Sequence, residues 1–320
     1  MAYRIFVDGQ EGTTGLQIHE RLSLRSDVEI LHIDKEFRKD LNARRELINK
    51  SDITFLCLPD VAAKESVSLC TNPDTKIIDA STAHRVNPEW TYGLPELSHE
   101  QFQKIKKANR IANPGCHATG FLLGVAPLRL QGFLKRDVRL ASYSITGYSG
   151  GGKKLIAEYE SGKFSLKPGA SIPLFAPAPY ALALTHKHLP EMKMYADLEY
   201  APLFNPVLGP FYKGMAVSVA LFPEYFNKKM NPEILYEILA AHYENSRFVK
   251  VMPYASAPDL PNGRLNPTIC NDTNNACIYV FGNETHFQVT TIIDNLGKGA
   301  SGAAIQNMNI ALGLPEDTGL

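Results

Sequence analysis

Short apolar runs alternate with amphipathic segments along the first third of the chain. Runs with the length of strands occur at residues 4–7, 28–33, 53–58 and 76–80, and helical periodicity is present at 14–24 and 61–70. Strands that alternate with helices predict a parallel sheet connected by crossover helices. A sheet of this kind binds its ligands beyond the carboxyl ends of its strands, so we expect a binding site there.

The pattern changes after residue 111. A strand is predicted at 139–147 and leads into glycines at 150–152, and prolines then crowd residues 168–214, which indicates loops over a sheet. Further strands are expected at 215–222, 277–281 and 286–293, with a helix at 233–244 and a last helix at 299–312 whose small residues suit close packing. We predict two domains, one formed by residues 1–115 with 296–320 and the other by residues 116–295.

Composition and charge restrict the partners. The chain has 320 residues, 44% of them hydrophobic, and its 33 basic and 33 acidic side chains give a formal charge of zero. No net field would draw the molecule to nucleic acid or to an anionic membrane, so a small-molecule ligand is expected. The N-terminus lacks the layout of a signal peptide, and no apolar run approaches the length of about 20 residues needed to span a bilayer. We therefore expect a cytoplasmic protein that binds neither nucleic acid nor membrane.

A glycine-rich loop follows the first predicted strand. Gly9, Gly12 and Gly15 recur at every third position where the first helix begins, and Thr13 and Thr14 lie between them. Small residues let backbone N–H groups approach a phosphate, and a helix N-terminus carries partial positive charge. Glycines are also common in plain strand-to-helix turns, but in this context the spacing favours the binding of a dinucleotide pyrophosphate.

The second predicted strand ends at Asp34, about 20 to 25 residues beyond the loop, where a carboxylate would accept the ribose hydroxyls of NAD. Lys35, Arg38 and Lys39 follow it. These cations could neutralise the 2′-phosphate of NADP, or they could form a solvated basic loop. The residues by themselves leave NAD and NADP open.

Cys116 is the strongest candidate for a nucleophile. It follows a strand on an Asn113-Pro-Gly turn, at the predicted start of a helix, which exposes the sulfur and favours its thiolate. Pro127 is expected to kink or end this helix within about three turns. Packing roles suit the other cysteines, which are Cys57, Cys70, Cys270 and Cys277. Paired C-x-x-C spacing does not occur in the sequence, and we predict no metal site.

Thiol chemistry on an acyl group needs a side chain that moves protons near neutral pH, and histidine does so. His186 and His188 stand out among nine histidines because residues i and i+2 of an extended segment point the same way. The alternative is a solvent-facing pair on an edge strand. His117 is next to Cys116 in sequence, but adjacent helical side chains diverge by about 100°, which makes it a weaker candidate for the base.

These motifs together resemble the N-acetyl-gamma-glutamyl-phosphate reductase family of arginine biosynthesis, and the resemblance covers the whole chain. Its marks are the glycine loop, Tyr92-Gly-Leu-Pro-Glu-Leu97, Ala112-Asn-Pro-Gly-Cys-His-Ala-Thr119, His186-Lys-His-Leu-Pro-Glu191 and Asp294-Asn-Leu-Gly-Lys-Gly-Ala300. Many members have an aromatic residue where His117 stands, and residues 204–214 replace a longer segment. Both departures look like the family's shorter type, type 2. Aspartate-semialdehyde dehydrogenases share the fold and thiol chemistry, but their nucleophile and histidine motifs differ.

The resemblance implies an α/β fold with a Rossmann-type parallel-sheet NADP-binding domain and an α+β substrate and dimerisation domain of the semialdehyde dehydrogenase kind. It implies that Cys116 attacks the acyl phosphate, with His186 or His188 as the acid–base. Cofactor contacts are expected from Gly9, Gly12, Thr13, Thr14, Gly15, Asp34, Lys35, Ser81 and Asn295, the last near the nicotinamide. Substrate contacts are expected from Arg85, Asn113, Ser149 and Gly150.

The implied reaction is the NADP-dependent reduction of N-acetyl-gamma-glutamyl phosphate to N-acetylglutamate 5-semialdehyde through a thioester, in a homodimer or homotetramer. One alternative is another acyl-phosphate reductase, such as an aspartate-semialdehyde dehydrogenase or an enzyme acting on an aminoadipyl derivative. A second is a thiol-dependent acyl hydrolase or transferase, which has no use for a phosphate-binding glycine loop. A third is a non-catalytic NADP-binding regulatory module, which would leave Cys116 and the two histidines without a purpose.

Overall fold

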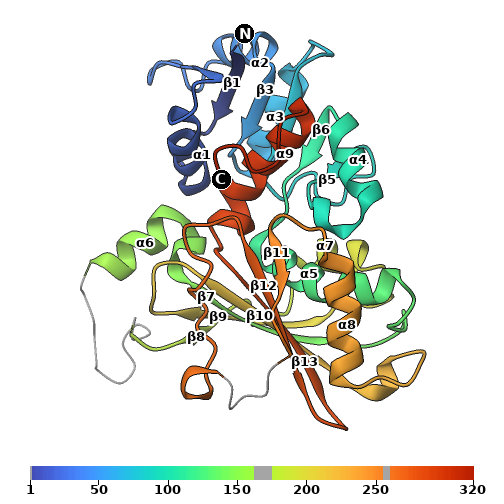
Figure 1. Cartoon of the computed structure of the whole chain (residues 1–320). Coiled ribbons are helices and arrows are strands. Elements are labelled where there is room, and N and C mark those ends of the chain that lie inside the picture. The colour runs from blue at the N-terminus through green and yellow to red at the C-terminus, as the bar shows by residue number, and fades with distance from the viewer. Residues whose placement is uncertain (1, 162–174, 255–259) are drawn as a thin grey trace. The chain divides into compact units, whose positions relative to one another are not determined.

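The chain divides into two units, each with its own β-sheet (Figure 1). The computed structural model describes residues 2–161, 175–254 and 260–320. The first unit consists of residues 1–115 and 300–320, and the second of residues 116–299. Within the proline-rich stretch predicted to form loops, residues 168–174 lie outside the described residues. Among the helices of the described ranges, none is both long and apolar enough to cross a lipid bilayer.

The first unit contains a six-stranded sheet in the order β2-β1-β3-β4-β6-β5, and its strands pair in parallel as predicted. The strands are β1 (Tyr3–Asp8), β2 (Val28–Leu31), β3 (Ile53–Leu56), β4 (Lys76–Asp79), β5 (Thr91–Tyr92) and β6 (Arg110–Ala112). The helices are α1 (Thr13–Ser23), α2 (Leu41–Lys50), α3 (Asp60–Leu69), α4 (His99–Lys107) and α9 (Gly302–Leu312). Because β2 and β3 flank β1 on opposite sides, the sheet has a topological switch point at the carboxyl ends of β1 and β3.

One apolar core joins the two chain segments of this unit. All residues of β3 are buried, as expected for a strand that is covered on both faces. Ile305 and Met308 of α9 pack in the same cluster as Ile5 and Phe55. The last helix of the chain is therefore part of the first unit's core.

Two helices of the first unit were not predicted. The helix α2 begins after an Asp40 N-cap. One of its buried positions is occupied by Arg44, whose guanidinium pairs with the Asp8 carboxylate at 3.0 Å. In α4 the buried residue is Ile105. Neither helix has the periodic apolar residues by which helices are predicted, because α2 buries a charged residue and α4 buries a single apolar residue.

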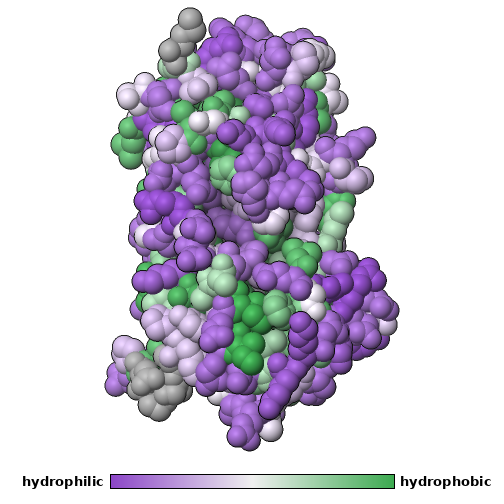
Figure 2. All heavy atoms as spheres, turned by 45° about the vertical axis from the view of Figure 1, so that its right-hand side comes forward, coloured by the Kyte–Doolittle hydropathy of each residue, from purple (hydrophilic) through white to green (hydrophobic). Residues whose placement is uncertain are grey.

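The second unit contains a seven-stranded mixed sheet in the order β11-β12-β13-β10-β7-β9-β8. Its strands are β7 (Ala141–Gly147), β8 (Ala178–Pro179), β9 (Leu203–Gly209), β10 (Met215–Leu221), β11 (Val249–Val251), β12 (Ala276–Gly282) and β13 (Phe287–Ile293). Its helices are α5 (Cys116–Leu130), α6 (Gly152–Glu160), α7 (Leu189–Tyr195) and α8 (Pro232–Tyr243). The helix α5 packs on β10 and β13, and α8 packs on β11 and β12. Figure 2 shows hydrophobic residues gathered on part of this unit's surface.

The strand β9 lies in the proline-rich stretch, so the prediction of loops was wrong for residues 203–209. The carbonyl oxygen of Pro206 accepts from the Tyr180 N–H at 3.1 Å, one residue past the end of β8. The N–H that proline lacks would point toward this short edge strand, where its loss costs little. Pairing with β7 along the whole of β9 makes the segment a strand.

The helix that begins at Cys116 is longer than predicted. Pro127 lies inside it, and α5 continues to Leu130. A proline leaves the carbonyl four residues earlier without its helical N–H partner. That carbonyl belongs to Leu123, and the Tyr243 hydroxyl of α8 donates to it at 2.7 Å. A tertiary contact thus replaces the missing bond, and the helix does not end at the proline.

Candidate active site

The glycine loop of the first unit connects β1 to α1 at the switch point of the sheet. Gly9 has a φ of +89°, and a Cβ there would lie 2.4 Å from the carbonyl oxygen of Cys57. A Cβ at Gly15 would lie 2.5 Å from the carbonyl oxygen of Gly9. Both positions therefore need glycine for the loop to close against the end of β3.

The same loop has the features of an anion site. Gly12 caps α1 without a side-chain hydrogen bond, and it is exposed. The Thr13 hydroxyl is buried and has no hydrogen-bond partner among the described residues. A helix N-terminus with uncapped N–H groups and an orphaned hydroxyl fits a dinucleotide pyrophosphate. The loop residues therefore fit the cofactor that the sequence predicted.

Charged residues lie beyond β2, where the sequence left NAD and NADP open. Asp34 and Lys35 are both exposed. The Arg38 guanidinium pairs with the Glu11 carboxylate at 2.6 Å, which connects this segment to the glycine loop. The Arg38 Nε is buried and lacks a hydrogen-bond partner among the described residues. Sequence reasoning included Arg38 among the candidate cations but did not find its partner in the loop.

Ser81 follows β4 and is bound to the end of that strand. Its hydroxyl donates to Asp79 Oδ2 at 2.7 Å, and its N–H donates to Asp79 Oδ1 at 2.9 Å. The His84 Nδ1 lies 2.6 Å from the same carboxylate, and the His84 ring stacks on Trp90. These contacts fix the turn after β4, and they occupy the Ser81 hydroxyl.

Arg85 and Asn113, predicted to contact substrate, are buried and bonded within the first unit. The Arg85 Nε donates to the Asn113 carbonyl at 2.9 Å. The Asn113 side chain donates to the Ala300 carbonyl at 2.9 Å and accepts from Asn307 at 3.1 Å. The two residues therefore hold the backbone of the turn that precedes Cys116 in the chain.

Cys116 is the first residue of α5 in the second unit, and it is half-buried. The first N–H groups of a helix have no partner within it and carry partial positive charge, which favours a thiolate and an oxyanion. A Cβ on Gly299 would lie 2.7 Å from the Cβ of Cys116. Glycine at this position therefore leaves room for the Cys116 side chain.

The thiol of Cys57 lies in surroundings that suppress its ionisation. All five cysteines lie in the described ranges, and none forms a disulfide. Burial raises the pKa of the Cys57 thiol to about 12, and the Asp79 and Asp8 carboxylates add to the effect. Such a thiol stays protonated and unreactive near neutral pH. Cys57 is thus suited to packing.

Imidazole rings gather beside α5. The ring centroids of His186 and His188 are 4.7 Å apart. The ring centroid of His117 lies 5.4 Å from that of His186 and 5.6 Å from that of His188. The two predicted histidines do lie together, but in a turn before α7 and not in an extended segment, and His188 is buried. The Phe204 ring packs against both His117 and His186.

His117 occupies the centre of this group. Its Nδ1 lies 2.8 Å from the Ser144 hydroxyl, and its Nε2 lies 2.7 Å from the Tyr180 hydroxyl. Burial lowers the pKa of His117 to about 3, with His186 and Lys187 adding to the effect, so its ring is neutral. A neutral buried ring is a poor acid–base.

Sequence reasoning missed Ser144 and Tyr180. A signal for Ser144 was present, because Ser142, Ser144 and Thr146 alternate along β7 and so share one buried face. Polar residues on a buried face need partners, and this pattern points to a site. Tyr180 carries no such signal, because it follows the two-residue strand β8 within the proline-rich stretch.

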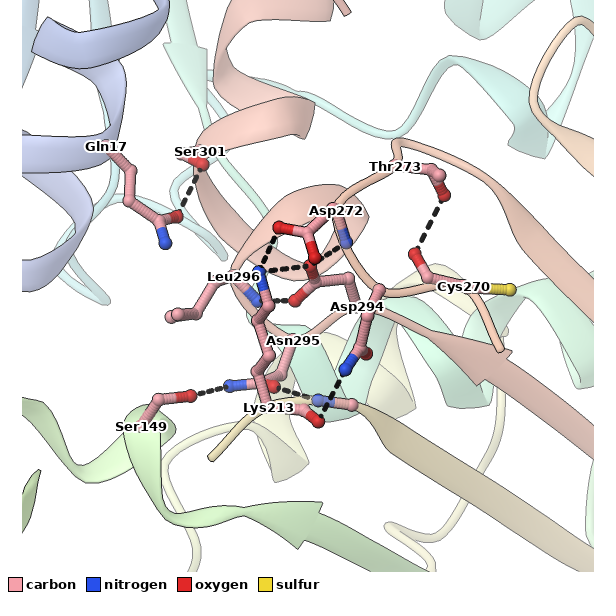
Figure 3. A network of polar contacts seen from close by, with 12 residues as sticks. Gln17, Ser149, Lys213, Cys270, Asp272, Thr273, Asp294, Asn295, Leu296 and Ser301 are labelled. Atoms are coloured by element: carbon pink, nitrogen blue, oxygen red, sulfur yellow. Dashed lines mark hydrogen bonds and ion pairs between the residues drawn. The ribbon is translucent and has the colours of Figure 1, made fainter. Parts of the chain in front are cut away.

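The Asn295 side chain holds the glycine turn that follows β7 (Figure 3). Its Nδ2 donates to the Ser149 hydroxyl at 3.0 Å, and its Oδ1 accepts from the Gly214 N–H at 2.8 Å. Next to it, Asp294 accepts from the N–H groups of Asp272 and Leu296. Three segments of the second unit are thereby fixed to the end of β13, including the turn that carries Gly150.

Comparisons with protein families and with solved structures define the class of protein to which this chain belongs. A model of the semialdehyde dehydrogenase NAD binding domain matches residues 23–105, and one of the semialdehyde dehydrogenase dimerisation domain matches residues 116–295. Among solved structures, aspartate semialdehyde dehydrogenase II from Vibrio cholerae is similar, with a TM-score of 0.74, 15% identity and coverage of 98% of this chain and 99% of that one. The chain is thus a semialdehyde dehydrogenase in fold, with an NAD(P)-binding domain, as predicted.

Sequence relatives narrow this class. N-acetyl-gamma-glutamyl-phosphate reductase 2 from Nostoc sp. is 43% identical over 320 residues, which cover 99% of each chain. N-acetyl-gamma-glutamyl-phosphate reductase from Chelativorans sp. is 45% identical over 316 residues, which cover 98% of this chain and 99% of the relative. The chain belongs to the N-acetyl-gamma-glutamyl-phosphate reductases, a family of oxidoreductases, as its motifs predicted.

Proposed function

We propose that the protein reduces N-acetyl-gamma-glutamyl phosphate to N-acetylglutamate 5-semialdehyde in arginine biosynthesis, with NADPH as reductant and Cys116 as nucleophile. The first unit would bind the dinucleotide, and the second would carry the thiol and the acid–base. The observation that carries this proposal is a cysteine at the N-terminus of a 15-residue helix whose next residue touches two further imidazoles. Full-length similarity to the named reductases supports the substrate.

In the first step the Cys116 thiolate attacks the acyl carbon, the bond to the phosphate oxygen breaks, and inorganic phosphate leaves. The product is a thioester on Cys116. Backbone N–H groups at the start of α5 would stabilise the oxyanion that develops on the acyl oxygen. The positive helix end also favours the thiolate that begins the reaction.

In the second step the thioester carbon is reduced. When bound, the dihydronicotinamide supplies the hydride for this step. The resulting thiohemiacetal oxyanion then expels the sulfur, and the aldehyde is released. We assign protonation of the leaving thiolate to His186 or His188, because an imidazole titrates near neutral pH and both rings lie beside the residue that follows Cys116.

We propose NADP and not NAD as the cofactor. Arg38 is already oriented toward the glycine loop by its ion pair with Glu11, and its buried Nε has a donor to offer. A guanidinium at this position suits the 2′-phosphate of NADP. We expect Lys35 to add positive charge at the same end, and we expect the Asp34 carboxylate to contribute little, because it has the same sign of charge as the phosphate.

We assign the other predicted residues two roles, which are binding of the pyrophosphate and shaping of the loops around the site. Gly9, Gly12, Thr13, Thr14 and Gly15 would cradle the pyrophosphate. The Ser81, Arg85 and Asn113 contacts support a role in shaping the loops that border the cofactor and substrate. Asn295 would act in the same way on the Ser149–Gly150 turn, next to the nicotinamide and substrate.

The test runs the reaction backwards with the stable aldehyde. Purified protein is given N-acetylglutamate 5-semialdehyde, phosphate and either NADP or NAD, and reduction of the cofactor is followed by absorbance. We expect turnover that requires phosphate, prefers NADP and disappears in Cys116→Ala, whose dinucleotide affinity stays near wild type. Turnover with aspartate semialdehyde instead would favour the related acyl-phosphate reductase. Phosphate-independent hydrolysis of acyl substrates would favour a thiol hydrolase.

A further inference from the structure

The turn after β4 holds an imidazole against a buried carboxylate. The Asp79 side chain is fully buried, and its Oδ2 lies 2.6 Å from the His84 Nδ1. The His84 ring stacks on Trp90, with ring centroids 4.1 Å apart and an angle of 12° between the planes. A hydrogen bond at one nitrogen and a stack on one ring face together fix the position and the orientation of the imidazole.

The hydrogen bonds of Asp79 also fix the tautomer of His84. The Ser81 N–H donates to Asp79 Oδ1. The Ser81 hydroxyl accepts from the Ala83 N–H, so it donates its own hydrogen to Asp79 Oδ2. Both oxygens of Asp79 are thus acceptors, and an ionised carboxylate can only accept. The hydrogen between Asp79 and His84 therefore belongs to Nδ1, and the Nε2 of the neutral ring keeps a lone pair.

This lone pair is accessible to a ligand. No described residue forms a hydrogen bond with the His84 Nε2, and this atom is not one of the buried polar atoms left without a partner. Nε2 therefore reaches solvent, although the side chain as a whole is only 8% exposed. A phenyl ring would stack on Trp90 equally well, so packing alone does not require an oriented acceptor at this position.

The turn lies where the nicotinamide half of a dinucleotide is expected. The strands run in the order β2-β1-β3-β4, so the adenosine half would extend from the switch point over β2 and the other half over β3 and β4. The glycine loop closes against β3 at Cys57, and the Ala80 N–H after β4 donates to the Leu56 carbonyl of β3 at 2.9 Å. Two strand spacings, roughly 10 Å, separate the end of β1 from this turn.

We propose that His84 is a further cofactor-binding residue, whose Nε2 accepts a hydrogen bond from a hydroxyl of the ribose that carries the nicotinamide. A ribose hydroxyl can donate to a lone pair, whereas an ionised phosphate can only accept. Asp79 and Trp90 are positioning residues, because they hold the ring and its tautomer. The proposal rests on dinucleotide binding at the glycine loop and does not depend on the acyl substrate.

The test compares whole and half ligands by calorimetric titration of the full-length protein. NADPH and NADH contain the nicotinamide ribose, whereas adenosine 2′,5′-bisphosphate and ADP contain only the adenosine end. His84→Phe keeps the stacked ring and removes both nitrogens. His84→Gln and His84→Met have side chains of similar length, but only Gln has an amide that can accept. His99→Phe, at an exposed histidine of the first unit, is the matched control.

We expect His84→Phe and His84→Met to weaken binding of the preferred dinucleotide about tenfold, because one hydrogen bond is lost, and to change the affinity for the matching half ligand less than about twofold. His84→Gln should recover part of the loss, since its amide oxygen can accept from the same hydroxyl. His99→Phe should match wild type with every ligand.

An equal loss for the whole and the half ligand would overturn the proposal, because the pair of Asp79 and His84 would then only support the loop. Unchanged dinucleotide affinity with a raised KM for the semialdehyde would also overturn it, because His84 would then serve the acyl substrate. If His84→Phe does not fold, the comparison of His84→Met with His84→Gln decides the matter. The titrations contain no acyl substrate, so a wild-type protein that binds NADPH but does not oxidise N-acetylglutamate 5-semialdehyde would contradict the proposed function and leave this inference standing.

Discussion

Close packing at single residues determines where the Cys116 thiol can lie. The start of α5 approaches the segment after β13 so closely that Gly299 has no room for a methyl group beside Cys116. The Gly299 N–H also donates to the Asp294 carbonyl at 2.9 Å, which fixes the backbone at this point. A residue far from Cys116 in sequence thus sets the position of the sulfur.

Gly299→Ala should therefore act on the thiol more than on the fold. The added Cβ would lie 2.7 Å from the Cβ of Cys116, so one of the two residues must shift. A displacement of this size costs about 100-fold in kcat when a reacting group loses its alignment. Steady-state kinetics and Cys116 alkylation should both slow, with circular dichroism unchanged. Wild-type kcat in a folded Gly299→Ala protein would show that the close approach does not matter to catalysis.

At the level of elements, the N-terminus of α1 has two kinds of glycine. Gly9 and Gly15 are required by the protein's own backbone, since their Cβ atoms would meet carbonyl groups or chain atoms at less than 3.0 Å. Gly12 differs, because a Cβ there would meet the Gly9 oxygen at an ordinary 3.6 Å. The fold tolerates a side chain at Gly12, so a need for glycine there would come from the ligand.

Gly12→Leu provides a clean test of the cofactor loop. The melting temperature should stay within a few degrees of wild type, because a Cβ at Gly12 would make only ordinary van der Waals contacts, at 3.6 and 3.7 Å, with the Gly9 and Cys57 carbonyl oxygens. The affinity for NADPH, measured by fluorescence titration, should fall by about fivefold or more, since a crowded side chain costs about 1 to 3 kcal/mol. Gly12→Ala should give a smaller loss. Equal NADPH affinity in all three proteins would place the pyrophosphate elsewhere.

On the scale of the whole molecule, the sheet of the second unit has one face toward its helices and one away from them. Ser144 of β7 faces His117 of α5, so Tyr143 points to the opposite side. Leu203 of β9 pairs with Ala141 and shares that side with Tyr143. Tyr143 is 54% exposed and Leu203 is 50% exposed. We propose that this face packs against a second copy of the chain, in keeping with the matched dimerisation domain.

Charges on this face should separate the copies. Tyr143→Glu combined with Leu203→Glu would bury carboxylates in an apolar contact, which is costly without a partner. Sedimentation velocity at micromolar concentration should show a dimer or tetramer for wild type and a smaller species for the variant. Val61→Glu in α3, at a residue 83% exposed in the first unit, is the control and should keep the wild-type mass. A monomeric wild type would remove the basis for this interface.

Local rules account for much of what the sequence predicted. The parallel sheet of the first unit follows from apolar runs such as 53–58, because a strand covered on both faces must be apolar throughout. Cys116 at a helix start was predicted from the Pro-Gly turn before it. Prediction failed where tertiary contacts override local rules, as at Pro127, where Tyr243 replaces the lost bond, and at Pro206, where pairing with β7 makes a strand.

By itself the sequence determined the class of fold and the family, and it predicted the glycine loop after β1 and the closeness of His186 to His188, since each depends on residue types at short spacing. Which groups meet was decided by the tertiary structure. His117 bonds to Ser144 and Tyr180, Arg38 pairs with Glu11, and Gly299 makes room for Cys116. Such contacts join residues tens or hundreds of positions apart, and no local pattern of polarity or spacing encodes them, because they arise only when separate elements pack together.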